Sequence, residues 1–69
     1  MASFVIVTED GSYPEGEEMS FPELNVGRVH LESYRHEGDY VVLHFAGGVE
    51  MAIPESRVQR IVTRGQVAS

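Results

Sequence analysis

The chain contains 69 residues, with 11 acidic side chains, 5 arginines and no cysteine. This length allows a single small domain over residues 1–69, and the lack of cysteine excludes disulfides and thiolate metal sites. A formal net charge of −6 disfavours direct binding to nucleic-acid phosphate or to acidic membranes.

Runs of β-branched and aromatic residues separated by glycine-bearing turns predict an all-β domain. The first strand is expected over residues 3–8. Glycine and proline then predict a long acidic loop over residues 9–27, with a short extended piece at residues 19–21. Three more strands are expected over residues 28–36, 40–46 and 49–53.

The register of the central hairpin follows from the side of each strand on which apolar residues fall. Leu43 and Phe45 share one face of their expected strand. Because a slip of one residue exchanges the two faces, we expect the register that places Leu31 opposite Phe45. The same register places Ser33 opposite Leu43 and requires a three-residue turn over residues 37–39.

The last third of the chain combines a tight turn, a helical turn and a segment with two interpretations. The pair of glycines at residues 47–48 is expected to set Phe45 opposite Met51, with a bulge nearby. A helical turn is expected over residues 54–57, because proline suits its first position. Residues 58–63 fit a last short strand but also one face of a short helix, and we expect the strand.

The order of these elements and two short stretches resemble SH3-like small barrels. Five short strands, a long loop after the first strand and one helical turn before the last strand follow that topology. The stretches EGEEMSF and IPESRV lie where SH3 domains carry an acidic ELSF-type stretch and a PSNYV-type turn. The chain has no ALYDY-type stretch and no tryptophan, so no proline-peptide groove is implied. We therefore expect a small five-stranded SH3-like barrel or a strongly bent antiparallel sheet.

The net charge lies entirely in the first third of the chain. Residues 1–27 hold six acidic side chains and no arginine, whereas residues 28–69 hold five of each. The six acids are Glu9, Asp10, Glu15, Glu17, Glu18 and Glu23. Solvation of a surface loop accounts for the acidity, and pairing with Arg57, Arg60 and Arg64 is a further alternative. An electrostatic surface for a basic protein partner accounts for the segregation as well.

The outer face of the central hairpin carries Tyr34 and Tyr40, close to Val42. If it is uncovered, this face is an apolar and aromatic patch of the kind found at protein interfaces. Burial by the acidic loop and burial in a homodimer are the alternatives. The apolar loop residues available for such cover are Tyr13, Met19, Phe21 and Leu24.

The same face carries a candidate metal site formed by His30, Glu32 and His44. Two imidazoles and a carboxylate are ligand types for Zn²⁺ or a similar ion. The alternative is an ordinary cross-strand pair between Glu32 and His44 on a solvated face, typically worth ~0.2–1 kcal/mol.

No nucleophile elbow, phosphate-binding loop or dinucleotide fingerprint occurs, which argues against an enzyme. The longest apolar run, residues 4–7, is too short for a membrane span or signal peptide, so we expect a soluble cytoplasmic protein. We expect no cofactor. The protein would bind another macromolecule through the six acids, Tyr34 and Tyr40. It would act as an inhibitor or accessory protein of a basic, nucleic-acid-handling partner. The alternatives are a metal- or small-ligand-binding protein and a structural homo-oligomer.

Overall fold

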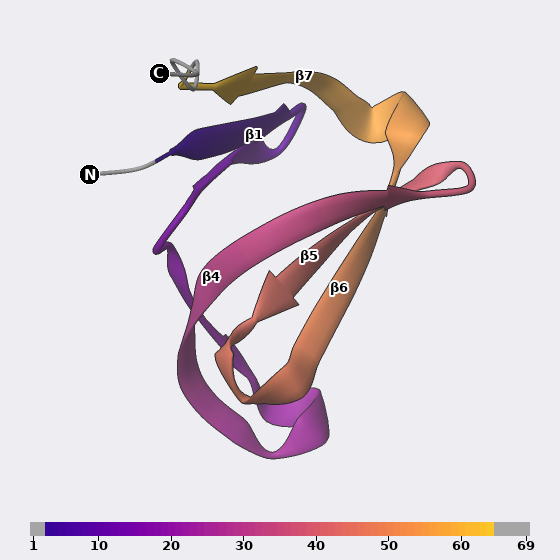
Figure 1. Cartoon of the computed structure of the whole chain (residues 1–69). Coiled ribbons are helices and arrows are strands. Elements are labelled where there is room, and N and C mark those ends of the chain that lie inside the picture. The colour runs from indigo at the N-terminus through magenta and orange to yellow at the C-terminus, as the bar shows by residue number, and fades with distance from the viewer. Residues whose placement is uncertain (1–2, 65–69) are drawn as a thin grey trace.

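A computed structural model describes residues 3–64, and these residues form an all-β fold (Figure 1). Its strands are β1 (Phe4–Thr8), β2 (Gly11–Pro14), β3 (Glu18–Phe21), β4 (Val26–Glu37), β5 (Tyr40–Phe45), β6 (Val49–Pro54) and β7 (Val58–Thr63). Short 3-10 turns lie at η1 (Pro22–Leu24), η2 (Ala46–Gly48) and η3 (Glu55–Arg57). The all-β prediction is confirmed, and the number of strands in the described part is seven rather than five.

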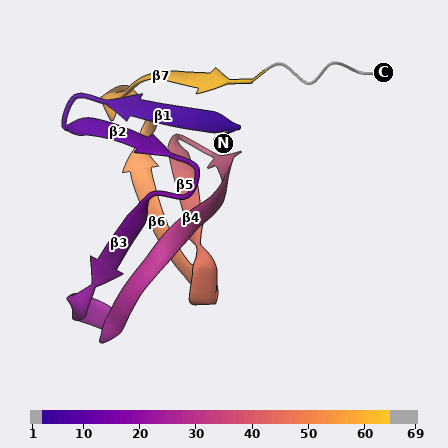
Figure 2. The same ribbon diagram turned by 90° about the vertical axis from the view of Figure 1, so that its left-hand side faces the viewer.

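The strands form two antiparallel sheets that curl together into a half-barrel. One sheet has the order β2-β1-β7 and the other has the order β3-β4-β5-β6. Figure 2 shows the chain passing from β2 in the first sheet to β3 in the second, while β7 returns to lie beside β1. The strongly bent antiparallel sheet expected from the sequence is therefore present.

The two additional strands come from the segment that was predicted to be a loop. The turn after β1 is closed by Thr8, whose hydroxyl donates to the Gly11 carbonyl at 3.0 Å and accepts the Asp10 N–H at 3.2 Å. Gly16, at a φ of 91°, then redirects the chain toward β4. There the Gly16 N–H donates to the carbonyl of Leu31 at 2.8 Å. The short extended piece expected at residues 19–21 is confirmed as part of β3. The loop prediction was wrong over β2, because pairing with β1 outweighs the local preference of glycine and proline for turns.

The hydrophobic core lies between the two sheets. Its fully buried members include Ile6 from β1, Leu31 from β4 and Phe45 from β5. Phe21 of β3 packs edge-on against Phe45, with ring centroids 5.1 Å apart. The apolar face predicted for β5 is confirmed, because Leu43 is also fully buried on the same side as Phe45. Val42, expected on the opposite face beside the tyrosines, is buried as well, with 5% of its surface exposed.

The register between β4 and β5 contains a bulge that the sequence analysis missed. Leu31 pairs with Phe45, as expected, but Ser33 pairs with His44 and Tyr34 pairs with Leu43. The pairing shifts between Leu31 and Ser33, so one extra residue of β4 is accommodated there. The turn is correspondingly shorter than predicted. Glu37 pairs directly with Tyr40, which leaves a two-residue connection with Gly38 at a φ of 61°.

The pairing of β5 with β6 also differs from the prediction. Phe45 pairs with Val49 rather than with Met51, so the register is displaced by two residues and the faces are preserved. The turn η2 closes this hairpin because Gly47 and Gly48 both adopt positive φ angles of 83° and 81°. No bulge interrupts this pair of strands.

The last described elements follow the sequence analysis closely. The helical turn is η3, which begins one residue after Pro54, and Pro54 itself ends β6 in an extended conformation. The strand predicted over residues 58–63 is confirmed as β7. Its pairing with β1 joins the two ends of the described chain.

Candidate functional site

Of the six acids of the first third, one lies on the end strand β3 and the other five lie on the turns beside β2 and β3. Glu9 and Asp10 occupy the turn between β1 and β2, and Glu15 and Glu17 flank the bend at Gly16. Glu18 starts β3 and Glu23 lies in η1. Figure 2 shows this part of the chain running down one side of the molecule. We call this set of six side chains the acidic edge.

The acidic edge is only partly neutralised by arginine. Among the described residues, the Arg57 guanidinium lies 4.0 Å from Asp10, and that of Arg28 lies 3.5 Å from Glu18. Both pairs are largely exposed, so each contributes only ~0–1 kcal/mol. The C-terminal arginines therefore reach the acidic edge at one carboxylate, and four of its six acids make no ion pair within residues 3–64.

Glu15 has a structural contact as well as a charge. Its Oε1 accepts a hydrogen bond from the backbone N–H of Ser3 at 2.7 Å. The Glu15 N–H donates to the carbonyl of Phe4 at 3.0 Å, so this residue ties the bend to the start of β1. The bend that carries Glu15 is consequently fixed to the first sheet rather than forming a free loop.

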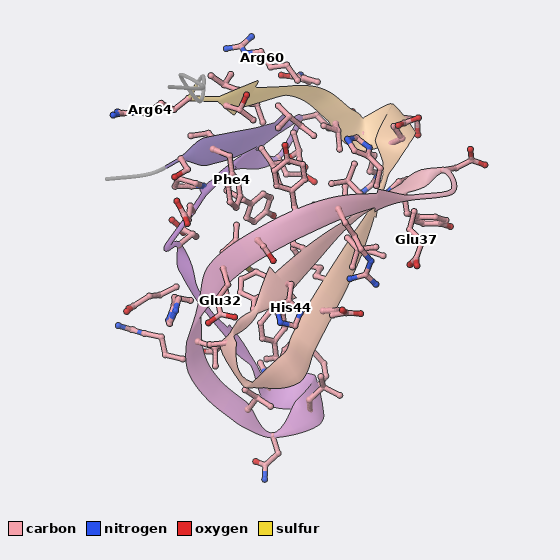
Figure 3. All side chains as sticks on the ribbon, in the orientation of Figure 1. Phe4, Glu32, Glu37, His44, Arg60 and Arg64 are labelled. Carbon is pink, nitrogen blue, oxygen red and sulfur yellow. The ribbon has the colours of Figure 1, made fainter. Side chains whose placement is uncertain are left out.

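The candidate metal ligands are brought together on the outer face of the second sheet (Figure 3). His30 Nε2 lies 3.6 Å from Glu32 Oε2, and His44 Nε2 lies 3.8 Å from Glu32 Oε1. The expected proximity of the three side chains is therefore present. However, residues 3–64 contain no group of three or more histidine and carboxylate side chains arranged to hold a metal ion.

Two residues that the sequence analysis did not select complete this cluster. Arg35 Nη1 lies 2.9 Å from Glu50 Oε2, and the same carboxylate oxygen lies 3.5 Å from His44 Nδ1. The hydrogen bond and charge of Arg35 lower the pKa of Glu50, and Glu50 in turn raises the pKa of Arg35. We call His30, Glu32, Arg35, His44 and Glu50 the paired face. Glu50 is engaged by the Arg35 guanidinium, so a protein cation already lies against the carboxylate next to His44, which disfavours the metal interpretation.

The bulge in β4 separates the two tyrosines that were expected to share a surface patch. Tyr34 turns toward the core side, where its ring packs edge-on against Phe4 with centroids 4.8 Å apart. Tyr40 remains 48% exposed, beside a shallow depression lined by Asp39, Pro54, Glu55 and Ser56. The predicted aromatic patch of Tyr34 and Tyr40 is therefore wrong.

The apolar residues proposed to cover that patch have other positions. Tyr13, Met19 and Phe21 pack against the core from β2 and β3. Leu24 in η1 is 62% exposed. The first three side chains complete the interior of the half-barrel, whereas Leu24 covers neither the core nor the outer face of β4 and β5.

Comparison with protein-family models, with curated proteins and with solved structures finds no match for this chain. Within residues 3–64, no helix has the length and apolar character needed to cross a membrane.

Proposed function

We propose that this chain is a non-enzymatic protein that binds a basic macromolecular partner through the acidic edge. The observation that carries this proposal is the placement of six carboxylates on β3 and on the turns beside β2 and β3, with ion pairs at two of the six within residues 3–64. An inhibitor or accessory protein acting on a nucleic-acid-handling partner would use such a surface.

Fixed carboxylates in a row suit a partner that normally binds phosphates. Several like charges on one side of a small protein create a local potential that speeds the encounter with a cationic surface. The backbone of β2 and β3 is hydrogen-bonded to β1 and β4, so this part of the backbone need not be ordered on binding. The acidic edge would therefore act as a preformed imitation of a nucleic-acid backbone.

Two triple variants with the same change in net charge test this proposal. The edge variant neutralises Glu15, Glu17 and Glu18, each to glutamine. The control variant neutralises three exposed acids of the β4–β5 hairpin and η3: Glu37→Gln, Asp39→Asn and Glu55→Gln. Glutamine at residue 15 keeps an oxygen that can accept the Ser3 N–H, so the bend should persist.

Binding to an arginine-rich synthetic peptide, and capture of proteins from the native host, should be measured at low and high salt. We expect the edge variant to lose binding and the control variant to keep most of it, with unchanged melting temperatures. Because exposed charges are screened beyond ~8–10 Å, binding should weaken as salt rises. Equal losses in the two variants would show that net charge alone is responsible and would overturn the localised site.

We also propose an SH3-like arrangement for the sheet and a cytoplasmic location for the protein. The short 3-10 turn immediately before the last strand supports the fold assignment. An experimental structure superposed on SH3-like barrels would test it.

A further inference from the structure

The strand β7 lies at the end of its sheet, with one edge that pairs with no other strand of the described chain. The N–H of Arg64 donates to the carbonyl of Ser3 at 2.8 Å, which makes these residues a hydrogen-bonded pair. Hydrogen-bonded and non-bonded pairs alternate in an antiparallel ladder. It follows that the N–H and C=O groups of Ile61 and Thr63 point away from β1, toward the free edge.

The side chains on the outer face of β7 form an alternating pattern of charge and apolar surface. Arg60 pairs with Val7 and Val62 pairs with Val5, on the side opposite the buried Phe4 and Ile6. Val62 is 50% exposed. Figure 3 shows Arg60 and Arg64 projecting from this end of the molecule, away from β4, β5 and β6. Residues 60, 62 and 64 thus read as cation, apolar residue and cation.

Arg60 and Arg64 form no ion pair within the described residues. Within residues 3–64, the arginines that form ion pairs are Arg28, Arg35 and Arg57. A shallow depression lies between the ends of β1 and β7, and it is lined by Ser3, Phe4, Val5, Val62, Thr63 and Arg64. An unpaired strand edge, an exposed valine, two cations and a depression therefore coincide at one place.

We infer that β7 accepts an extended segment of an acidic partner protein as an additional strand. Backbone groups of Ile61 and Thr63 would hydrogen-bond the incoming segment, as in other cases of strand addition. Its side chains facing Arg60, Val62 and Arg64 would be acidic, apolar and acidic, at alternate positions. Because this pattern reads the same in both directions, it fits a parallel or an antiparallel segment.

A second copy of this chain that pairs through its own β7 satisfies the arginines less well. The strand β7 contains no carboxylate, so pairing β7 with its own copy gives Arg60 no anionic neighbour on that strand. If such a pair were centred on Val62, Arg60 would face Arg64 of the copy, and like charges directly opposite are destabilising. The charge pattern therefore selects an acidic segment. This surface is distinct from the acidic edge, and the inference does not depend on the proposed function.

The probe is a fluorescein-labelled peptide with the sequence Thr-Glu-Thr-Val-Thr-Glu-Thr, and the matched control peptide carries lysine in place of both glutamates. Fluorescence anisotropy should show tighter binding of the glutamate peptide. Amide hydrogen exchange followed by NMR should show slower exchange at Ile61 and Thr63 when that peptide is bound. The amides of Val62 and Arg64 already donate to β1, so their exchange should change little.

A charge exchange locates the site. The Arg60→Glu variant should bind the glutamate peptide about tenfold more weakly, while an Arg28→Glu control, with the same charge change on an exposed residue of β4, should stay within about twofold. The double variant Arg60→Glu and Arg64→Glu should bind the lysine peptide more tightly than the wild-type chain does. A glutamate peptide methylated on the amides that face β7 should not bind.

Equal binding of the two peptides, or equal losses in Arg60→Glu and Arg28→Glu, would overturn the inference. So would slow exchange of the Ile61 and Thr63 amides without peptide in a chain that light scattering shows to be a dimer, because the edge would then be occupied by its own copy.

Discussion

The outer faces of the two sheets use charge in different ways. On the paired face, formed by β4, β5 and β6, the Arg35 guanidinium reaches Glu50 and Glu37, and His44 lies between Glu32 and Glu50. On the outer face of β7, Arg60 and Arg64 flank an exposed valine and form no ion pair among the described residues. The charged side chains of the paired face contact one another, whereas Arg60 and Arg64 on the outer face of β7, unpaired within residues 3–64, remain free to bind an acidic partner.

This difference shows why counting charges along the chain gives an incomplete account of binding surfaces. Residues 28–69 are neutral overall, yet their cations and anions do not cancel locally, because β7 contains no acidic residue whereas Arg60 lies on it and Arg64 directly follows it. The half-barrel therefore presents the acidic edge, the paired face and a cationic strand. Only the folded arrangement distinguishes these three surfaces.

The largest expected effect is in the core that supports both faces. The Phe45→Ala variant removes a fully buried ring that touches Phe21, and such truncations typically cost about 3–5 kcal/mol. A core of this size rarely supplies more than about 3–5 kcal/mol, so the variant should be unfolded at 25 °C. Circular dichroism during heating would test this, with Val62→Ala as the exposed control. A cooperative transition near the wild-type temperature would contradict the assigned core.

The next effect concerns the bend that separates the two sheets. Gly16 has a φ of 91° and open space around a Cβ built there, so Gly16→Ala should introduce backbone strain without a clash, costing about 1–3 kcal/mol. Gly27→Ala is the control. Gly27 is not held at a positive φ and also has open space, so alanine there should be neutral or slightly stabilising. Denaturant unfolding would measure both changes, and equal losses would mean that Gly16 is not strained.

A smaller, pH-dependent effect is expected on the paired face. Arg35 lowers the pKa of Glu50 below its ordinary value of 4.5, with His44 Nδ1 also 3.5 Å from this carboxylate. A lowered carboxyl pKa gives stability that is fully present above the unfolded pKa and is lost as pH falls through the folded pKa. The Glu50→Gln variant should therefore melt below wild type near neutral pH. The difference should shrink as pH falls below about 4.5. A difference independent of pH would exclude this charge interaction.

The smallest effect on stability is expected at β7. Arg60→Gln removes a charge that forms no ion pair within residues 3–64, so the free energy of unfolding should stay within about 0.5 kcal/mol of wild type. Urea unfolding of this variant beside Arg35→Gln would compare the outer faces of the two sheets directly. A larger loss for Arg60→Gln would show that the arginine has a structural role, and the contrast between the two faces would fail.

Much of the fold could be predicted, because in most strands the local sequence pattern favours the same structure as the long-range strand pairing. The alternation of Leu43 and Phe45 identified the buried face of β5, and the ambiguous segment over residues 58–63 proved to be a strand. The segment over residues 9–27 could not be predicted in this way. Its glycines and prolines suit turns, and its strands exist because β1 and β4 supply partners for their backbone groups.

The candidate site could be predicted only where its residues lie on the same strand or on two strands joined by a short turn. The sequence identified the acidic residues and the proximity of Glu32 to His44. It did not reveal that Glu50 would be held by Arg35, since that contact spans β4 and β6, which lie on either side of β5. The position of Tyr34 was missed because one extra residue in β4 exchanges the faces of everything that follows it.

By itself, the sequence determined that this chain forms β-strands around a small apolar core and that its excess negative charge is confined to the first third. These properties depend on side-chain type and on alternation within one strand. The tertiary structure alone decided the bulge, the bend at Gly16, the paired face and the isolation of the arginines on β7. Each of these depends on which strands become neighbours, and neighbouring strands are set by the packing of the whole core.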